Sequence, residues 1–107
     1  MERRTRRSTR IHEALTHFFD ALCLKRSLDA VALTTHDGLL IAGKGQVDLE
    51  ELGALGAAAK KAQASFRDQT LHVSRFEVND VILCLTSMGA PVRDDAAVGS
   101  LMRILAA

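Results

Sequence analysis

The run VILCLTSM at residues 81–88 constrains the fold more than any other part of this sequence. It is almost unbrokenly apolar and lacks the alternation of a strand that has one solvent-facing side. Such a run is typical of an interior strand that is covered on both faces of a sheet. We therefore expect a sheet with helices packed on it.

Three other segments have strand patterns. Residues 29–35 (DAVALTT) and 39–43 (LLIAG) are separated by a short stretch that ends in glycine, which predicts a hairpin. Residues 70–78 (TLHVSRFEV) alternate at first and then change phase between Ser74 and Phe76, which predicts a bulge or a bend. Asn79-Asp80 predicts a turn into the apolar run.

Three segments have helical patterns. Residues 11–24 place their apolar side chains on one face of a helix. Asp48 and Glu51 have the spacing of a capping box, so we expect a second helix to begin there and to extend to about Phe66. Its apolar stripe consists of Leu52, Leu55, Ala59, Ala62 and Phe66. A last helix is predicted from Asp94 or Asp95.

The predicted order of elements is α-β-β-α-β-β-α. This is an α/β (α+β) fold, with an antiparallel central sheet of four to five strands flanked by helices. The length of 107 residues corresponds to one domain.

Charge is spread unevenly along the chain. Residues 1–10 hold five arginines and one glutamate, whereas the rest holds nine basic and twelve acidic side chains. We expect residues 1–9 to form a basic disordered arm and residues 10–107 to form the domain. The arm has no aromatic side chain for base stacking, but binding of nucleic acid or of an anionic membrane stays an alternative.

Two cysteines at this spacing form neither a disulfide framework nor a zinc site. No apolar run reaches the roughly 18 residues that a membrane-spanning helix needs. We expect a cytoplasmic protein without a cofactor, a metal ion or an integral membrane contact.

His36 and Asp37 raise the question of catalysis. Adjacent side chains on a turn do not converge on a substrate without a third group, and no nucleophile motif is present. Asp37-Gly38 fits turn chemistry, so we expect no enzyme; an enzyme that uses His36 is the weaker alternative.

Two other patterns favour structural roles. His12 and His17 are too far apart around a helix to share a metal ion, and Gly43-Lys44-Gly45 lacks the phosphate-binding pattern G-x-x-x-x-G-K-[ST].

Four segments in this order resemble the roadblock family of dynein light chains and bacterial GTPase regulators. They are IHEALTHFFDAL, LDAVALTTHDGLLIAG, DLEELGALGAAAKKAQ and VILCLTSMG with the helix after it, and together they cover roughly residues 10–107. The resemblance implies a longin-like fold, obligate dimers and no catalytic centre. It also implies binding of a small Ras-like GTPase or of another roadblock protein, as in bacterial cell polarity and gliding motility.

One feature departs from the family pattern. Roadblock domains usually place three strands between the second and third helices, and only two are legible here. Either one is missing or a short one lies in residues 66–70. In the family this strand often lies at the dimer edge.

The second helix is rich in small residues, which permit close approach of another backbone. The residues alone leave open whether this is the chain's own sheet or the same helix of a second copy. The resemblance favours a homodimer, with an interface at Leu52, Leu55, Gly56, Ala59, Ala62 and Phe66. Partner contacts are then expected at Lys44, Lys60, Lys61 and Arg67.

Overall fold

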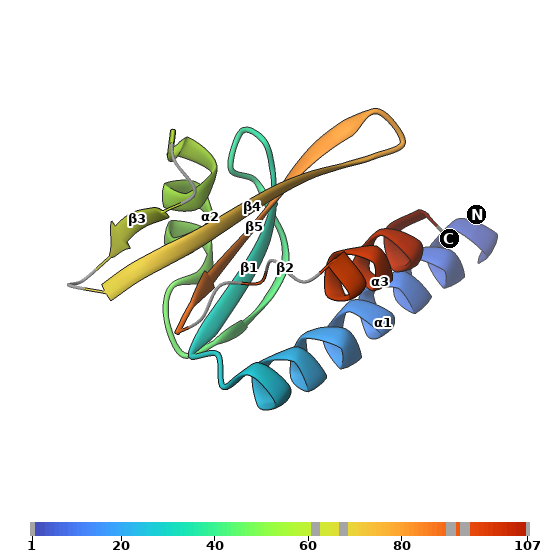
Figure 1. Ribbon diagram of the computed structural model, residues 1–107. Helices are drawn as coiled ribbons and strands as arrows, with labels where there is room; N and C mark the ends of the chain where they lie inside the picture. The colour runs from blue at the N-terminus through green and yellow to red at the C-terminus, as the bar shows by residue number, and fades with distance from the viewer. Residues whose placement is uncertain (1, 61–62, 67–68, 90–91, 93–94, 107) are drawn as a thin grey trace.

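The computed structural model describes residues 2–60, 63–66, 69–89, 92 and 95–106. In this part of the chain three helices flank a five-stranded antiparallel sheet (Figure 1). The helices are α1 (Glu2–Arg26), α2 (Leu49–Ala58) and α3 (Asp95–Ala106). The strands are β1 (Ala30–Thr35), β2 (Leu40–Gly45), β3 (Gln63–Phe66), β4 (Gln69–Val78) and β5 (Val81–Met88).

The sheet has the strand order β2-β1-β5-β4-β3. β5 lies at its centre and pairs with β1 on one side and with β4 on the other. The prediction that residues 81–88 form an interior strand is therefore confirmed. The two terminal strands of the sheet are β2 and β3.

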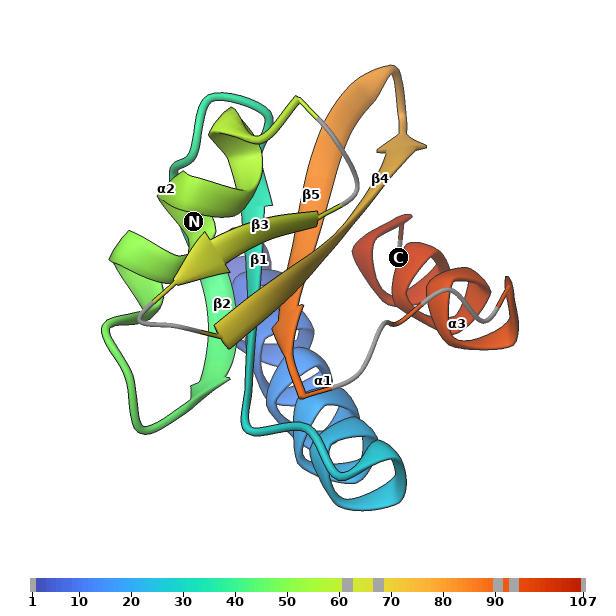
Figure 2. The same ribbon diagram turned by 60° about the vertical axis from the view of Figure 1, so that its left-hand side comes forward.

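Helices cover both faces of the sheet. α2 lies on one face, and α1 and α3 lie together on the other (Figure 2). The strands alternate accordingly: Val31 and Leu33 belong to the core under α1 and α3, whereas Ala30 and Ala32 belong to the core under α2. Large side chains thus fill one side of β1 and small ones the other, which lets α2 sit close to the sheet.

The second helix is shorter than predicted. It ends at Ala58, with an extended backbone at Ala59, and Gln63–Phe66 forms β3 instead. The expectation of a helix to Phe66 was wrong. Of the two alternatives for the missing strand, a short strand is present, but it spans Gln63–Phe66 and shares only Phe66 with the expected residues 66–70. The reason is that Phe66 is buried through pairing of β3 with β4, so its place in a helical stripe was coincidental.

The predicted bulge in residues 70–78 was also wrong. The register between β4 and β5 is unbroken from Leu71–Met88 to Val78–Val81. The phase change has another cause: Leu71 lies in the core under α2, whereas Phe76 and Val78 pack against the core under α1 and α3.

The first helix begins earlier than the apolar pattern indicates. Its backbone is helical from Glu2, so residues 2–9, which the sequence predicts as a disordered arm, continue α1. Among the residues of α1 whose side chains the structure describes, which begin at Arg10, Ile11 is the first that packs on the core.

Candidate interaction surfaces

The turn between β1 and β2 is held by its own polar groups. The hydroxyl of Thr35 accepts the N–H of Leu39 at 3.1 Å and donates to the carboxylate of Asp37. That hydrogen bond, with a smaller contribution from His36, lowers the pKa of Asp37 below its ordinary value. Gly38 has a φ of +93°, as its place in the turn predicts. The structure of the turn therefore explains the presence of His36 and Asp37 at these positions.

The inner face of α2 packs on the chain's own sheet. A Cβ atom on Gly53 would overlap Thr34 of β1, and one on Gly56 would overlap the hydroxyl of Thr86 in β5. Both threonines are fully buried, and neither hydroxyl has a hydrogen-bond partner in the structure. The glycines thus serve close packing within one chain.

The residues predicted for the dimer interface divide into three groups. Leu52, Gly56 and Phe66 are buried within the single chain, so their side chains have no surface to offer a second copy. Ala62 lies outside the described residues. Ala59 is half-buried at the end of α2, and Leu55 is 38% exposed.

The outer face of α2 is acidic in its first turn and small and apolar after it. Its exposed residues are Glu50, Glu51, Ala54, Leu55 and Ala58. α2 also contacts β3, and β3 pairs only with β4 among the described strands. We call this face together with β3 the α2–β3 edge. It combines a smooth helix surface with a sheet edge that is free in the described part of the chain.

The basic residues predicted to contact a partner lie apart. Lys60 is exposed, and Lys61 and Arg67 lie outside the described residues. Lys44 forms an ion pair with Asp20 of α1, which raises its pKa. Because Lys44 ties β2 to α1, it has a structural role that the sequence did not reveal. The nearby Cys23 thiol has a raised pKa, chiefly because it is partly buried.

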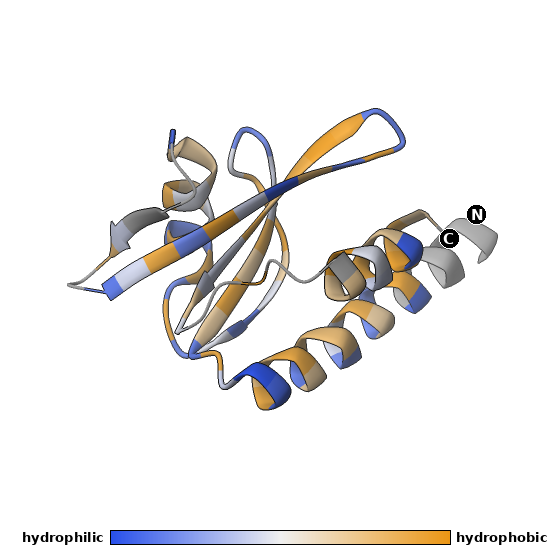
Figure 3. Ribbon diagram, viewed as in Figure 1, coloured by the Kyte–Doolittle hydropathy of each residue, from blue (hydrophilic) through white to orange (hydrophobic). Residues whose placement is uncertain are grey.

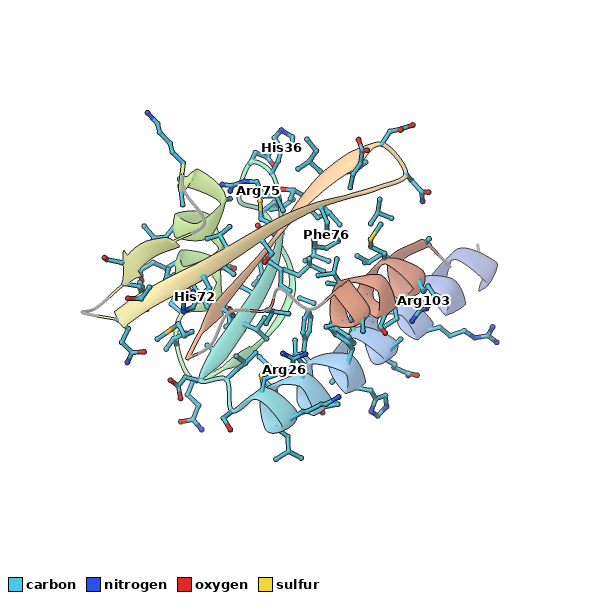
Figure 4. The ribbon with its side chains drawn as sticks, in the orientation of Figure 1. Arg26, His36, His72, Arg75, Phe76 and Arg103 are labelled. Atoms are coloured by element: carbon cyan, nitrogen blue, oxygen red, sulfur yellow. The ribbon has the colours of Figure 1, made fainter. Side chains whose placement is uncertain are left out.

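Arg75 makes a contact with the end of α2 that the sequence did not predict. Its guanidinium donates to the carbonyls of Gly56 at 3.4 Å and Ala57 at 3.3 Å, and also to that of Ala59 (Figure 4). These carbonyls end α2, which has no basic residue in its own last turn. Because the sequence pattern extends this helix through Lys60 and Lys61, it gave no signal of this contact.

A second apolar surface lies where β1 and β5 meet the turns at one end of the sheet. Leu39 is 70% exposed, Val81 48% and Ile82 49%. The start of β5, after the β4–β5 turn, has a hydrophobic colour in Figure 3. The expectation that residues 81–88 are covered on both faces holds only from Leu83 onward, because the β4–β5 hairpin extends past the helices (Figure 1). We call Leu39, Val81 and Ile82, with the turns beside them, the hairpin end.

No group of three or more His, Cys, Asp or Glu side chains in the described ranges could hold a metal ion. His12 and His17 are exposed, and the buried Nδ1 atom of His72 has no hydrogen-bond partner. None of the described helices is both long and apolar enough to cross a membrane. Comparison with models of protein families and with curated proteins finds no match for this chain.

Proposed function

We propose that this protein is a non-catalytic, dimeric scaffold of the roadblock type in the cytoplasm. It binds a small Ras-like GTPase or another roadblock protein, with bacterial cell polarity or motility as the setting. The observation that carries the proposal is β3. It supplies a third strand between α2 and α3, which the sequence pattern lacked and which roadblock domains usually have.

The α2–β3 edge supports a homodimer. A two-fold axis brings identical surfaces together, and the small side chains of Ala54 and Ala58 permit two helices to approach closely. A terminal strand such as β3 has unpaired backbone groups that can pair with the same strand of a second copy.

Binding without catalysis accounts for the polar groups that the sequence singled out. Asp37 bonds to Thr35, and Lys44 pairs with Asp20. A scaffold regulates its partner through a difference in affinity for the partner's nucleotide states. A partner that binds equally in both states is held but not switched.

The alternative of nucleic-acid or anionic-membrane binding has one supporting observation. The backbone of residues 2–10 is helical, so the five arginines of this segment are carried by a defined element. Affinity that depends on phosphate contacts falls steeply with added salt.

The test of the scaffold is its mass in light scattering together with capture of its partner. We expect twice the chain mass of 11.6 kDa for the unaltered protein, and a single chain mass for Leu55→Glu. Capture from the native cell extract, with GDP or a non-hydrolysable GTP analogue added, is expected to recover a small GTPase.

The matched control is Leu24→Glu. Leu24 is 85% exposed on α1, away from the α2–β3 edge, and this variant is expected to remain dimeric. An unaltered protein of single chain mass at tens of micromolar would contradict the dimer. Recovery of nucleic acid instead of a GTPase would favour the alternative.

A further inference from the structure

Pairing within the sheet places the two turns of the hairpin end at the same end of the sheet. Thr35, the last residue of β1, pairs with Leu83 of β5, and beyond this pair the two turns diverge (Figure 1). His36 still lines one hollow with Val81 and Ile82, which are exposed at the start of β5. β3 pairs with residues 69–72, at the opposite end of β4 from the turn. The proposed dimer strand thus leaves the β4–β5 turn uncovered.

The hairpin end is bordered by negative charge. Asp37, Glu77 and Asp80 are exposed, and neither residues 36–41 nor residues 76–83 contain a lysine or an arginine. The nearest arginine, Arg75, donates to the end of α2. The hydroxyl of Thr35 donates a hydrogen bond to the carboxylate of Asp37 and lowers its pKa.

The shape of this surface suits side chains of a macromolecule. His36, Asp80, Val81 and Ile82 line an open hollow of about 270 Å³. Pockets for small molecules usually occupy about 300–1,000 Å³ and enclose most of the ligand. Val81 and Ile82 follow each other on β5 and point to opposite faces of the sheet, and both line this hollow at the end of the strand. Exposed apolar side chains with a polar border are typical of protein interaction sites.

The negative charge at the hairpin end favours some binding partners over others. An anionic membrane or the phosphates of a nucleic acid would be repelled by the three carboxylates. A second copy docked through the same surface would bring two acidic borders face to face. A protein segment with aliphatic side chains and Lys or Arg beside them complements both the apolar centre and the acidic border.

We propose that the hairpin end is a docking site for a protein partner that presents aliphatic side chains bordered by lysine or arginine. This inference rests on the proposed scaffold function and assigns its partner contact to a surface other than the basic residues Lys44 and Lys60.

The experiment titrates the isotope-labelled full chain with two synthetic amphipathic peptides of equal length, one of leucine and lysine and one of leucine and glutamate. NMR amide shifts locate the binding. We expect the leucine–lysine peptide to shift residues 36–41 and 77–83, to weaken with added salt, and to bind at least about tenfold more tightly than the leucine–glutamate peptide.

Two variants separate contact from folding. Ile82→Ser removes an exposed anchor and is expected to weaken binding about tenfold. Glu77→Gln with Asp80→Asn preserves shape while removing two charges, and is expected to weaken binding roughly threefold for each charge. Leu24→Ser, at an exposed leucine on α1, is the control that is expected to leave binding unchanged.

Equal binding of both peptides, no binding, or shifts confined to another surface would overturn the proposal. A fall in the mass of Ile82→Ser by light scattering would also overturn it, because the occupant would then be a second copy. A chain that is monomeric yet binds the leucine–lysine peptide at the hairpin end contradicts the proposed dimer and supports this inference.

Discussion

Gly56 is the residue on which the distance between α2 and the sheet depends most directly. Its missing side chain leaves room for the hydroxyl of Thr86, and Gly53 does the same for Thr34 one turn earlier. Glycine inside a helix costs about 1 kcal/mol relative to alanine. Close packing of α2 on β1 and β5 is the compensation, because it buries Leu52 completely.

We expect Gly56→Ala to lower the free energy of unfolding by about 1–3 kcal/mol, because the new methyl group overlaps a fully buried side chain. Urea unfolding measures the change. The control is Gly99→Ala in α3, where the nearest atom to a new Cβ is a guanidinium nitrogen of Arg103 at 3.8 Å. That variant is expected to raise stability by up to about 1 kcal/mol. The same sign for both variants would contradict the packing argument.

The pKa of Asp37 gives a second prediction for a single side chain. The pKa of Asp37 in the folded state is lower than its ordinary value of 3.8. The stabilisation of the fold that goes with this shift is therefore present above pH 3.8 and is lost as the pH falls through the lower folded-state pKa. Thr35→Val is expected to raise this pKa toward 3.8, because the hydroxyl is the largest cause of the shift.

Carboxyl carbon shifts in an NMR titration measure this pKa directly. His36→Gln is the comparison, since His36 contributes the smallest of the causes and its loss is expected to move the pKa less. A larger shift in His36→Gln than in Thr35→Val would refute the assignment to the turn hydroxyl.

The two ends of helix α2 are stabilised by residues at different separations in the sequence. Its first turn is capped by Asp48, whose carboxylate accepts the N–H of Glu51 at 3.2 Å, only three residues away. Its last carbonyls accept from Arg75, on a strand well separated in sequence. The start of α2 is therefore stabilised by a residue close in sequence, and its end is stabilised by a residue that the tertiary structure brings near.

Arg75→Ala is expected to lower the free energy of unfolding by about 1 kcal/mol, because the last carbonyls of α2 lose charged donors near the negative end of the helix dipole. Hydrogen exchange of α2 amides is expected to accelerate. Arg75→Lys should recover part of the loss, since it keeps the charge without the planar group.

Arg103→Ala is the matched control for that measurement. Arg103 is also exposed, and its one described hydrogen bond is to the nearby Ser100. An equal loss of stability in both variants, or unchanged exchange in α2, would contradict the role of Arg75.

The whole molecule is a sheet between two unequal helical layers. On β1, α1 and α3 cover the large side chains of Val31 and Leu33, and α2 covers the small ones of Ala30 and Ala32. From Arg10 onward, where the side chains of α1 are described, Ile11 is the first that packs on the core. Residues 10–107 therefore contain the described core.

Removal of residues 1–9 is accordingly expected to change the free energy of unfolding by less than about 1 kcal/mol. The shortened chain is expected to retain its dimer mass and its protein partner. Loss of cooperative unfolding would show that the segment belongs to the fold. Loss of partner capture, together with salt-sensitive binding of nucleic acid by the full chain, would favour the alternative function.

Much of this architecture was legible in the residues. The apolar face of α1, the β1–β2 hairpin, the cap at Asp48 and the interior position of β5 all follow from spacing within short windows. Burial repeats every two residues in a strand and every 3.6 in a helix, so neighbouring residues carry that information.

Other features depended on segments far apart in the chain. The end of α2, the strand β3, the inward direction of Gly53 and Gly56 and the exposure of Val81 and Ile82 were not legible. Each depends on a part of the chain that packs against it. Arg75 binds the end of α2, β4 pairs with β3, and Thr34 and Thr86 lie opposite the glycines. Val81 and Ile82 are exposed because the helical layers end before the hairpin end. A residue pattern specifies which side chains need burial, but which surface buries them is a property of the assembled fold.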